Sequence, residues 1–387
     1  MILHQPCKKT LGDKVRLLAD FELNGRIDTL WYEIDKKYEK FLVTEQCDPF
    51  LLIILIKAIE ENQDIEIKSQ VSSKLYYGLI NYIIPYLSYV FKSNQPKLNA
   101  FKLNNNSLNI EQNHSVGMSC GVDSMSTYIN NNYECKINEI EYFTFFNVGS
   151  HGNIKSNYNL VSYESSFQNA KSFAQLENKV ILEVNSNMSD ILKSDFKSTH
   201  TFRNISAALI FQKLIKNYYY SSAFKFTQIQ INPKDPSSFD VFLLQGLSTE
   251  STYFYSSMLS HSREERVELI SNYSNKLNSF IDVCVTPNHD TEFLNCSSCY
   301  KCIITQIVLE INGTLKEFDK SFDLQKFYER KDKFIARLML DRKKNILFNN
   351  LYNYIIEKDS SYIKTYHSLL SVKLKFYRFK RNILFKE

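Results

Sequence analysis

The chain has 387 residues with a formal net charge of +5, and 44% of them are hydrophobic, which is ordinary for a globular protein of two or three domains. This charge is too small to predict nucleic-acid binding by itself. The longest apolar run, at 50–56, is too short to span a bilayer, and the N-terminus lacks the apolar stretch of a signal peptide. We therefore expect a cytoplasmic protein with no membrane association.

The first part of the chain predicts a small N-terminal α+β domain over residues 1–110. Alternating apolar and polar residues predict strands, and spacing of three to four residues predicts helices. The predicted elements are strands at 14–18, 41–44 and 65–68 and helices at 50–61 and 72–91. The polar, asparagine-rich stretch 97–112 follows, and we place a domain boundary there.

From residue 114 onward, short apolar segments alternate with helix-like segments. The segments predicted as strands are 115–118, 142–147, 180–184 and 218–224. The segments predicted as helices are 124–131, 165–176 and 204–216. Strands that alternate with helices indicate an α/β fold with a parallel sheet. Beyond Cys302 the sequence predicts only helices.

A loop of small residues lies between the predicted strand at 115–118 and the helix that follows it. Ser119, Gly121 and Ser124 leave backbone amides uncovered. Because a helix start adds the positive end of its dipole, such a loop can hold an oxyanion such as pyrophosphate. Asp123, at the mouth of the helix, can hold a Mg²⁺ ion that screens the phosphates. The alternative is an ordinary turn that caps a helix.

This loop resembles the Ser-Gly-Gly-x-Asp-Ser motif of the PP-loop ATP pyrophosphatases, also called adenine nucleotide alpha hydrolases. The resemblance implies a doubly wound, Rossmann-like parallel sheet of the HUP class that binds ATP and Mg²⁺. The residues that it places at the nucleotide are Ser119, Cys120, Gly121, Val122, Asp123 and Ser124. Cys120 replaces a glycine, and if the backbone there has a positive φ, the side chain costs about 1 kcal/mol. A thiol at a helix N-terminus can also be reactive.

Three further positions are candidates for the nucleotide site by the same resemblance. An Arg-Asn pair begins a helix in related enzymes, and Arg203 with Asn204 matches it. Arg203 carries a planar, permanent charge suited to phosphate, with a surface role as the alternative. The loop after the second strand binds adenine in the family, and Gly149 lies there. Arg263 matches a basic residue in a later loop of the family.

Arg263 is flanked by residues that predict a helix start. Ser262 fits the N-cap position and Glu265 fits the capping-box position three residues later. A phosphate role for Arg263 is an additional hypothesis. Asp123, Arg203 and Arg263 are thus the candidate catalytic residues. His200 and His261 are candidate general bases, with a structural role as the alternative for each.

Four cysteines near the C-terminal third form the pattern C-x11-C-x2-C-x2-C. They are Cys284, Cys296, Cys299 and Cys302. Four thiolates in this order suit a tetrahedral, structural Zn²⁺ site, because no position is left open for a substrate. An iron–sulfur cluster is the alternative, and disulfides are not expected in the cytoplasm.

The cysteine pattern also resembles the 7-cyano-7-deazaguanine synthases, which carry a similar group near the C-terminus. The chain looks closer still to a PP-loop group that is often met beside polysaccharide or natural-product genes, through residues 48–75, 246–250 and 295–302. The resemblance covers residues 45–315. It implies a PP-loop ATP-binding domain over 111–283, a four-cysteine zinc element over 284–315 and a helical C-terminal region over 316–387.

The implied activity is adenylation of a carbonyl-type oxygen with release of AMP and pyrophosphate. Nitrogen or sulfur then displaces AMP and gives an amide, a nitrile or a thio product, and we lean to nitrogen and to a biosynthetic pathway. One alternative is an enzyme like the deazaguanine synthases that modifies a nucleobase, RNA or a protein terminus, including in phage defence. The other alternative is an ATP-binding, zinc-stabilised interaction protein without catalysis. The sequence does not identify the acceptor.

The C-terminal stretch interleaves basic and aromatic residues. The basic ones are Lys373, Lys375, Arg378, Lys380 and Arg381. Such a stretch can bind RNA or an acidic partner protein, and the alternative is an amphipathic helix with a solvated basic face. We also consider that the protein forms a homodimer.

Overall fold

The computed structural model describes residues 1–136, 138–151, 157–285 and 292–384. The chain divides into two compact units. The first contains residues 1–119 and 127–259, and the second contains 120–126 and 260–387. The boundary predicted at residue 110 therefore falls inside the first unit, and the nucleotide loop contributes residues to the second.

The first unit is built on one sheet of eleven strands. The strands are β1 (Ile2–Leu3), β2 (Cys7–Leu11), β3 (Lys14–Leu23), β4 (Arg26–Asp35), β5 (Ile65–Ser72), β6 (Leu98–Asn104), β7 (Asn113–Gly117), β8 (Tyr142–Asn147), β9 (Val180–Ser186), β10 (Ile215–Ser221) and β11 (Tyr253–Ser257). Their order is β11-β10-β7-β8-β9-β4-β3-β1-β5-β6, and β2 pairs with β3. The sheet is mixed, with mostly parallel pairs.

The half of the sheet from β11 to β9 is parallel throughout. Its chain order reverses between β7 and β10, because β8 and β9 lie on one side of β7 whereas β10 and β11 lie on the other. Ligands of open α/β sheets bind beyond the carboxyl ends of strands at such a point. The predicted α/β class is confirmed, and the order is compatible with a Rossmann-like fold.

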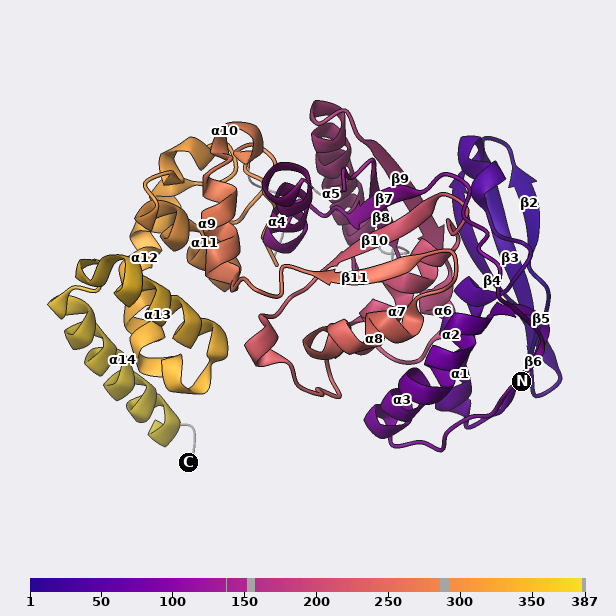
Figure 1. Cartoon of the computed structure of the whole chain (residues 1–387). Helices are drawn as coiled ribbons and strands as arrows, with labels where there is room; N and C mark the ends of the chain where they lie inside the picture. Colours follow the sequence, from indigo (N-terminus) through magenta and orange to yellow (C-terminus); the bar gives the residue numbers. More distant parts are fainter. Residues whose placement is uncertain (137, 152–156, 286–291, 385–387) are drawn as a thin grey trace. The chain divides into compact units, whose positions relative to one another are not determined.

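The helices of the first unit cover both faces of these parallel strands. They are α1 (Asp48–Glu61), α2 (Ser73–Gly78), α3 (Ile84–Phe91), α5 (Asn157–Leu176), α6 (Met188–Ile191), α7 (Phe196–Leu209) and α8 (Asp240–Leu247), with a π-helical segment at Leu79–Ile83. Figure 1 shows α5 on one side of the parallel strands and α7 and α8 on the other. α1 packs against α7, so the helical layer continues under the N-terminal strands.

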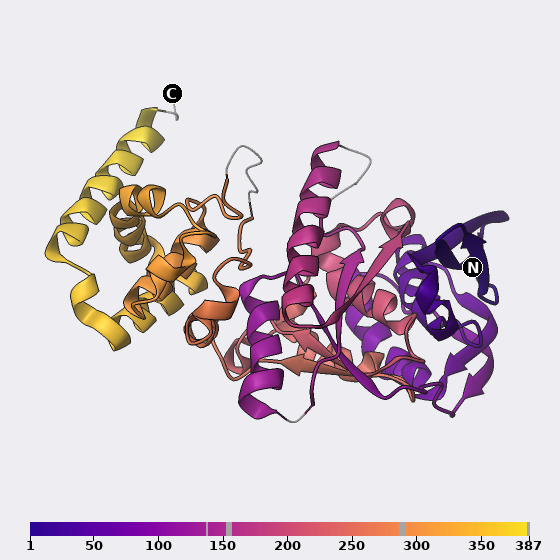
Figure 2. The same ribbon diagram turned by 90° about the horizontal axis from the view of Figure 1, so that it is seen from above.

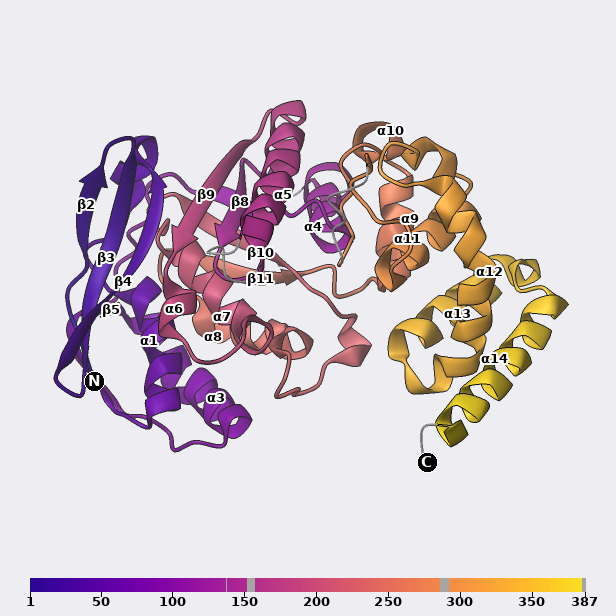
Figure 3. The same cartoon turned by 180° about the vertical axis from the view of Figure 1, so that it is seen from behind.

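The N-terminal strands extend the same sheet and do not form a separate one (Figure 3). β4 pairs with β9 in antiparallel register, with Tyr32 opposite Ser186. β3 alternates buried and partly exposed residues, as the sequence pattern predicts for a strand that covers a core on one face. The apolar core runs without interruption from these strands to the parallel half.

The strand predicted at 41–44 does not form. Residues Lys36–Phe41 form a 3-10 helix instead. The carboxylate of Asp35 accepts a hydrogen bond from the backbone nitrogen of Lys37 at 3.0 Å, and this cap turns the chain before a strand can begin. Conversely, the asparagine-rich stretch contains β6, which pairs in parallel with β5.

The second unit is helical. Besides the first residues of α4 (Val122–Ile129), it contains α9 (Arg263–Ser271), α10 (Ser274–Leu277), α11 (Tyr300–Ile311), α12 (Leu324–Asp341), α13 (Ile346–Asp359) and α14 (Thr365–Leu384). Figure 2 shows the last three helices joined by short connections, and α12 packs against both α13 and α14. The prediction of helices beyond Cys302 is confirmed. Among the described residues, every helix is too short or too polar to cross a bilayer.

Candidate functional site

The loop between β7 and α4 places Cys120 in a backbone conformation with positive φ, the case considered in the sequence analysis. Cys120 has φ +59°, in the left-handed region that favours glycine. Its side chain is fully buried, and its carbonyl oxygen accepts a hydrogen bond from the backbone nitrogen of Asp282 at 2.9 Å. The loop therefore tolerates a side chain where the family motif has glycine, at the energetic cost of a left-handed residue.

The same burial argues against a reactive thiol. Desolvation raises the pKa of Cys120 well above its usual range, and the negative charge of Asp282 raises it further. A thiol is a nucleophile only as the thiolate. Burial therefore favours the protonated, unreactive thiol, in contrast to the reactivity that a position at a helix N-terminus alone would allow.

Asp123 lies in the first turn of α4 and forms ion pairs with two arginines of α9. Its Oδ1 accepts a hydrogen bond from Arg266 Nη1 at 2.7 Å, and its Oδ2 lies 3.5 Å from Arg263 Nη1. Arg266 is fully buried, whereas the Asp123 side chain is 33% exposed. The structure thus brings together Asp123 and Arg263, two of the three candidate catalytic residues.

The predicted capping box holds Arg263 in place and is confirmed. The Ser262 hydroxyl accepts a hydrogen bond from the backbone nitrogen of Glu265, and the Glu265 carboxylate accepts one from the backbone nitrogen of Ser262. Arg263 is consequently the first residue of α9. Its Nε is buried and has no hydrogen-bond acceptor among the described residues.

Two basic residues near Asp123 were missed by the sequence analysis. Arg266 lies three residues after Arg263, so the two share one face of α9, and this spacing was the signal available. Lys301 lies between two cysteines of the metal motif, in the first turn of α11. Burial lowers the pKa of Lys301, and the positive charge of Arg263 lowers it further. The negative charge of Asp123 acts in the opposite direction and raises this pKa. Asp123 thus contacts two arginines, and Lys301 is near enough to interact with it electrostatically.

Arg203 lies in the middle of α7, and the prediction that it begins the helix was wrong. α7 begins at Phe196, because the Asp195 carboxylate caps it by accepting from the backbone nitrogen of Ser198 at 2.8 Å. Arg203 is 2% exposed, and burial lowers its pKa to about 10. Its guanidinium donates to four protein oxygens: Thr199 Oγ1, Val148 O, Ser189 Oγ and Ser194 O, at 2.7–3.1 Å.

Gly149 adjoins Arg203, so these two predicted site residues do meet. Gly149 has φ +114°, and a Cβ atom on it would lie 2.8 Å from Arg203 Nη1. Arg203 also binds the carbonyl of the preceding residue, Val148. In this geometry Arg203 holds the turn after β8 in shape.

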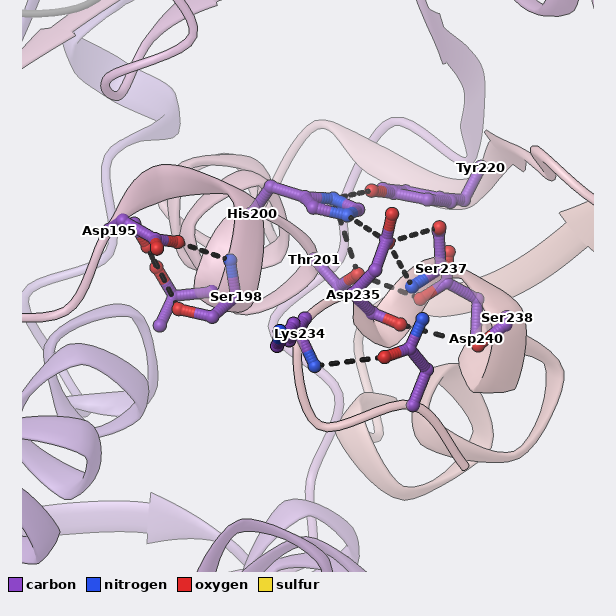
Figure 4. A network of polar contacts seen from close by, with 12 residues as sticks. Asp195, Ser198, His200, Thr201, Tyr220, Lys234, Asp235, Ser237, Ser238 and Asp240 are labelled. Carbon is purple, nitrogen blue, oxygen red and sulfur yellow. Dashed lines mark hydrogen bonds and ion pairs between the residues drawn. The ribbon is translucent and has the colours of Figure 1, made fainter. Parts of the chain in front are cut away.

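His200 belongs to a polar network at the carboxyl end of β10 (Figure 4). Its Nε2 lies 3.3 Å from Asp235 Oδ1, and its Nδ1 lies 3.2 Å from the Tyr220 hydroxyl. On the next residue of α7, the Thr201 hydroxyl donates to Asp240 Oδ1 at 2.7 Å. Both ring nitrogens of His200 are engaged, so the network ties the loop before α8 to α7. This supports the structural role for His200.

Asp240 is the most buried acid of this network. It is 1% exposed, and its Oδ2 has no hydrogen-bond partner among the described residues. Burial raises its pKa to about 7. The second candidate base, His261, contacts its neighbour Ser260 through Nδ1 at 2.8 Å.

The four motif cysteines converge as predicted. Their sulfur atoms all lie within 4.8 Å of one another, with Cys296 and Cys302 at 3.9 Å and Cys299 and Cys302 at 3.3 Å. Tetrahedral thiolates at about 2.3 Å from a metal ion lie roughly 3.8 Å apart, so the cluster fits such an ion. Hydrogen bonds from the Cys284 and Cys302 thiols lower the pKa of Cys299 and favour its thiolate.

The cluster is anchored by helix α11. Cys299 is the N-cap residue, and Cys302 is buried in the first turn. The backbone nitrogen of Cys299 donates to the Cys296 sulfur at 3.3 Å, an interaction that stabilises a thiolate. Cys284 precedes the residues that the structure leaves undescribed and still reaches the cluster.

The C-terminal basic stretch lies on α14. Lys373, Lys375 and Phe376 are exposed there. Arg378, Lys380 and Arg381 lie outside the residues whose side chains are described. The prediction of an RNA or acidic protein partner at this helix stays a prediction.

Comparisons of the chain with protein-family models, with curated proteins and with solved structures find no match.

Proposed function

We propose that this protein is an ATP pyrophosphatase of the PP-loop type, with a doubly wound sheet. In the proposed reaction a carbonyl-type oxygen of an acceptor attacks the α-phosphorus of ATP and releases pyrophosphate. A nitrogen or sulfur nucleophile then displaces AMP. The resemblance of residues 119–124 to the family motif and the chain reversal between β7 and β10 support this proposal.

The cluster of charges around Asp123 is the observation that carries the proposal. Arg263, Arg266 and Lys301 bring three positive charges, and Asp123 offsets one. The buried Nε of Arg263 lacks an acceptor among the described residues, which costs about 1–3 kcal/mol unless a ligand oxygen binds it. The helix start at α4 adds its dipole. This combination suits a multiply charged oxyanion such as pyrophosphate.

Each residue has a separate role in the proposal. Arg263 and Lys301 would bind the departing pyrophosphate, and Arg266 would hold Asp123 in position. Asp123 would bind Mg²⁺ through the exposed part of its carboxylate. Arg203 would act by positioning the turn at Gly149, where the family binds adenine, and not by direct contact with phosphate. ATP supplies the phosphoanhydride bond whose cleavage activates the acceptor.

The cysteine cluster would hold one Zn²⁺ in this proposal. Four sulfur ligands in a closed tetrahedron leave no place for a substrate, so the ion would be structural. Its contribution would be to fix the start of α11, which carries Lys301 between two of the ligands.

Nucleotide analysis tests the proposed reaction. We expect isothermal calorimetry to detect binding of Mg-ATP, and Asp123→Asn and Arg263→Ala to weaken it about tenfold or more. Incubation with cell extract fractions that contain the acceptor should convert ATP to AMP and pyrophosphate. ADP and phosphate as the main products would contradict the proposal, because the cleaved bond would then be the β–γ bond.

A second candidate is an ATP-binding protein that has lost catalysis. It is favoured by the ion pairs of Asp123, because both carboxylate oxygens already face arginines and a Mg²⁺ ion would have to compete with them. The strained Cys120 favours it too. Tight ATP binding without AMP formation from any acceptor fraction would select this candidate.

A further inference from the structure

A pocket in the first unit lies between the segment from α2 to α3 and helix α8. Its volume is about 750 Å³, within the range of roughly 300–1,000 Å³ found for small-molecule sites. Several aromatic rings line it, namely those of Tyr77, Tyr82, Tyr86, Tyr89, Phe239 and Phe242. Tyr77, Tyr82, Tyr89 and Phe242 are each more than half exposed, so the rings are available to a ligand.

Two sequence segments that the proposed nucleotide site does not use meet at this pocket. Glu250 accepts a hydrogen bond from the backbone nitrogen of Lys74 at 2.8 Å and another from the Ser72 hydroxyl. The carboxylate therefore caps the start of α2. The segments 71–75 and 246–250 are thus locked together beside the cavity.

Close backbone packing fixes the shape of the pocket. Gly78 lies against Gly246, and a Cβ atom built on Gly78 would lie 1.9 Å from the Gly246 carbonyl oxygen. Only glycine at position 78 permits this approach. Both glycines line the pocket, so the cavity lies where α2 and α8 pack closely against each other.

Lys74 is the only charged residue among the described residues that line the pocket. Its Nζ lies 3.8 Å from the centroid of the Tyr253 ring, a cation–π contact. No described residue accepts a hydrogen bond from this ammonium group or pairs with it within 4 Å. Burial lowers the pKa of Lys74, although the charge of Glu250 opposes the shift. A partly buried cation without an acceptor is a recognition point for an anion.

Tyr86 also lines the pocket, and the charges that act on it are negative. Its ring stacks on Phe239 with centroids 5.6 Å apart and an interplanar angle of 7°. Burial and the negative charges of Asp240 and Asp235 raise the pKa of its hydroxyl. These carboxylates disfavour an anion near Tyr86, so the pocket is polarised with its positive end at Lys74.

We propose that this pocket binds a planar aromatic small molecule that carries an anionic group. The aromatic body lies among the tyrosine and phenylalanine rings, and the anionic group pairs with Lys74. A flat aromatic ligand can stack on the exposed rings of the pocket, and its pairing with the ammonium group of Lys74 fixes the orientation of the ligand. The residues that line this pocket take no part in the proposed adenylation, and the binding proposal does not depend on that activity.

A pair of fluorescent probes tests the proposal on the full chain. 8-Anilinonaphthalene-1-sulfonate is an aromatic anion with a flat naphthalene ring, and N-phenyl-1-naphthylamine is its uncharged counterpart. We expect saturable binding of the sulfonate at one site per chain. Lys74→Met should weaken the sulfonate about tenfold and change the affinity of the uncharged probe less than twofold. Phe242→Ala should weaken both probes.

Matched controls separate this site from general hydrophobic adsorption. Lys102→Met removes an exposed lysine from β6 and should leave both affinities unchanged. Lys74→Gln provides a second charge-removing variant if methionine perturbs the fold, and thermal melting by circular dichroism confirms that each variant is folded. Unsaturable binding, or equal affinities in the wild type, the Lys74 variants and Phe242→Ala, would overturn the proposal.

Discussion

Arg266 and Asp123 form a buried ion pair with Nη1 and Oδ1 2.7 Å apart. The arginine is fully buried and the aspartate side chain is one-third exposed, so the carboxylate supplies the counter-charge of the buried cation while part of it stays exposed. The pair joins the first turn of α4 to α9, across 143 residues of sequence. It makes the loop conformation and the packing of α9 depend on each other.

Asp123→Asn should therefore reduce stability as well as nucleotide binding. The substitution leaves Arg266 buried without its counter-charge, and we expect the free energy of unfolding to fall by about 2–4 kcal/mol. Urea denaturation measures this change. Asp319→Asn, at an exposed position of the same unit, is the matched control and should be neutral. An Asp123→Asn protein as stable as the wild type would show that Arg266 does not depend on this carboxylate.

The sequence predicted those parts of the site that local patterns define. The capping box at Ser262, the convergence of the cysteines and most parallel strands follow from spacing and propensity. Arg266 and Lys301 were missed because their roles come from tertiary packing near Asp123, and the spacing of Arg266 from Arg263 indicates only that the two share one face of a helix. The helix containing Arg203 begins earlier than predicted, because the carboxylate of Asp195 caps it and Phe196 is its first residue.

Lys301→Gln should weaken pyrophosphate binding without loss of metal. The ammonium group is one of three cations near Asp123, and a charge-assisted contact to phosphate contributes about 1.5–3 kcal/mol, so we expect roughly tenfold weaker binding or more. Calorimetry with magnesium pyrophosphate measures it, and elemental analysis checks the metal. Lys320→Gln, at an exposed position, should bind like the wild type. If Lys301→Gln does so too, Lys301 is not part of the anion site.

The protein should contain about one zinc ion per chain. The four sulfurs lie within 4.8 Å of one another, and a structural zinc site contributes directly to folding. Cys299→Ser should therefore lower the melting temperature and the zinc content together. Cys135→Ser, which removes an exposed cysteine outside the cluster, is the control. Inductively coupled plasma mass spectrometry that finds no zinc, or visible absorption typical of an iron–sulfur cluster, would reject this prediction.

Asp240 should make the wild type less stable as the pH rises from about 4 to 7. Its pKa is about 7 in the folded protein, compared with the ordinary aspartate value of 3.8, so the folded state binds more protons than the unfolded state between these limits. The free energy of unfolding then decreases with pH across this window and becomes constant above it. Asp240→Asn removes the contribution.

Comparison of the variant with the wild type isolates this effect. Near pH 4, Asp240 is protonated in the folded state and largely so in the unfolded state, so the stabilities of the variant and the wild type should be similar. At pH 8 the variant should be the more stable by a few kcal/mol. Urea denaturation at both pH values measures the difference, and Asp195→Asn, at the exposed cap of α7, should show none. A stability difference that does not change with pH would contradict the assignment.

Two substitutions of Cys120 separate backbone strain from packing. The residue has φ +59° and a fully buried side chain, so glycine would relieve strain but lose the thiol contacts. Alanine also loses the sulfur but keeps the Cβ atom that is strained at this φ. The difference between the two variants therefore reports the strain alone, apart from the greater flexibility of glycine in the unfolded chain.

We expect Cys120→Gly to be more stable than Cys120→Ala by up to about 1 kcal/mol. This reverses the order at ordinary buried positions, where alanine is favoured because it loses less entropy on folding. Urea denaturation of the two variants, measured under the same conditions, shows which has the larger free energy of unfolding. If alanine is the more stable, the left-handed conformation at residue 120 is not a source of strain. The cysteine would then be no obstacle to a loop that binds phosphate as the glycine-containing loops of the family do.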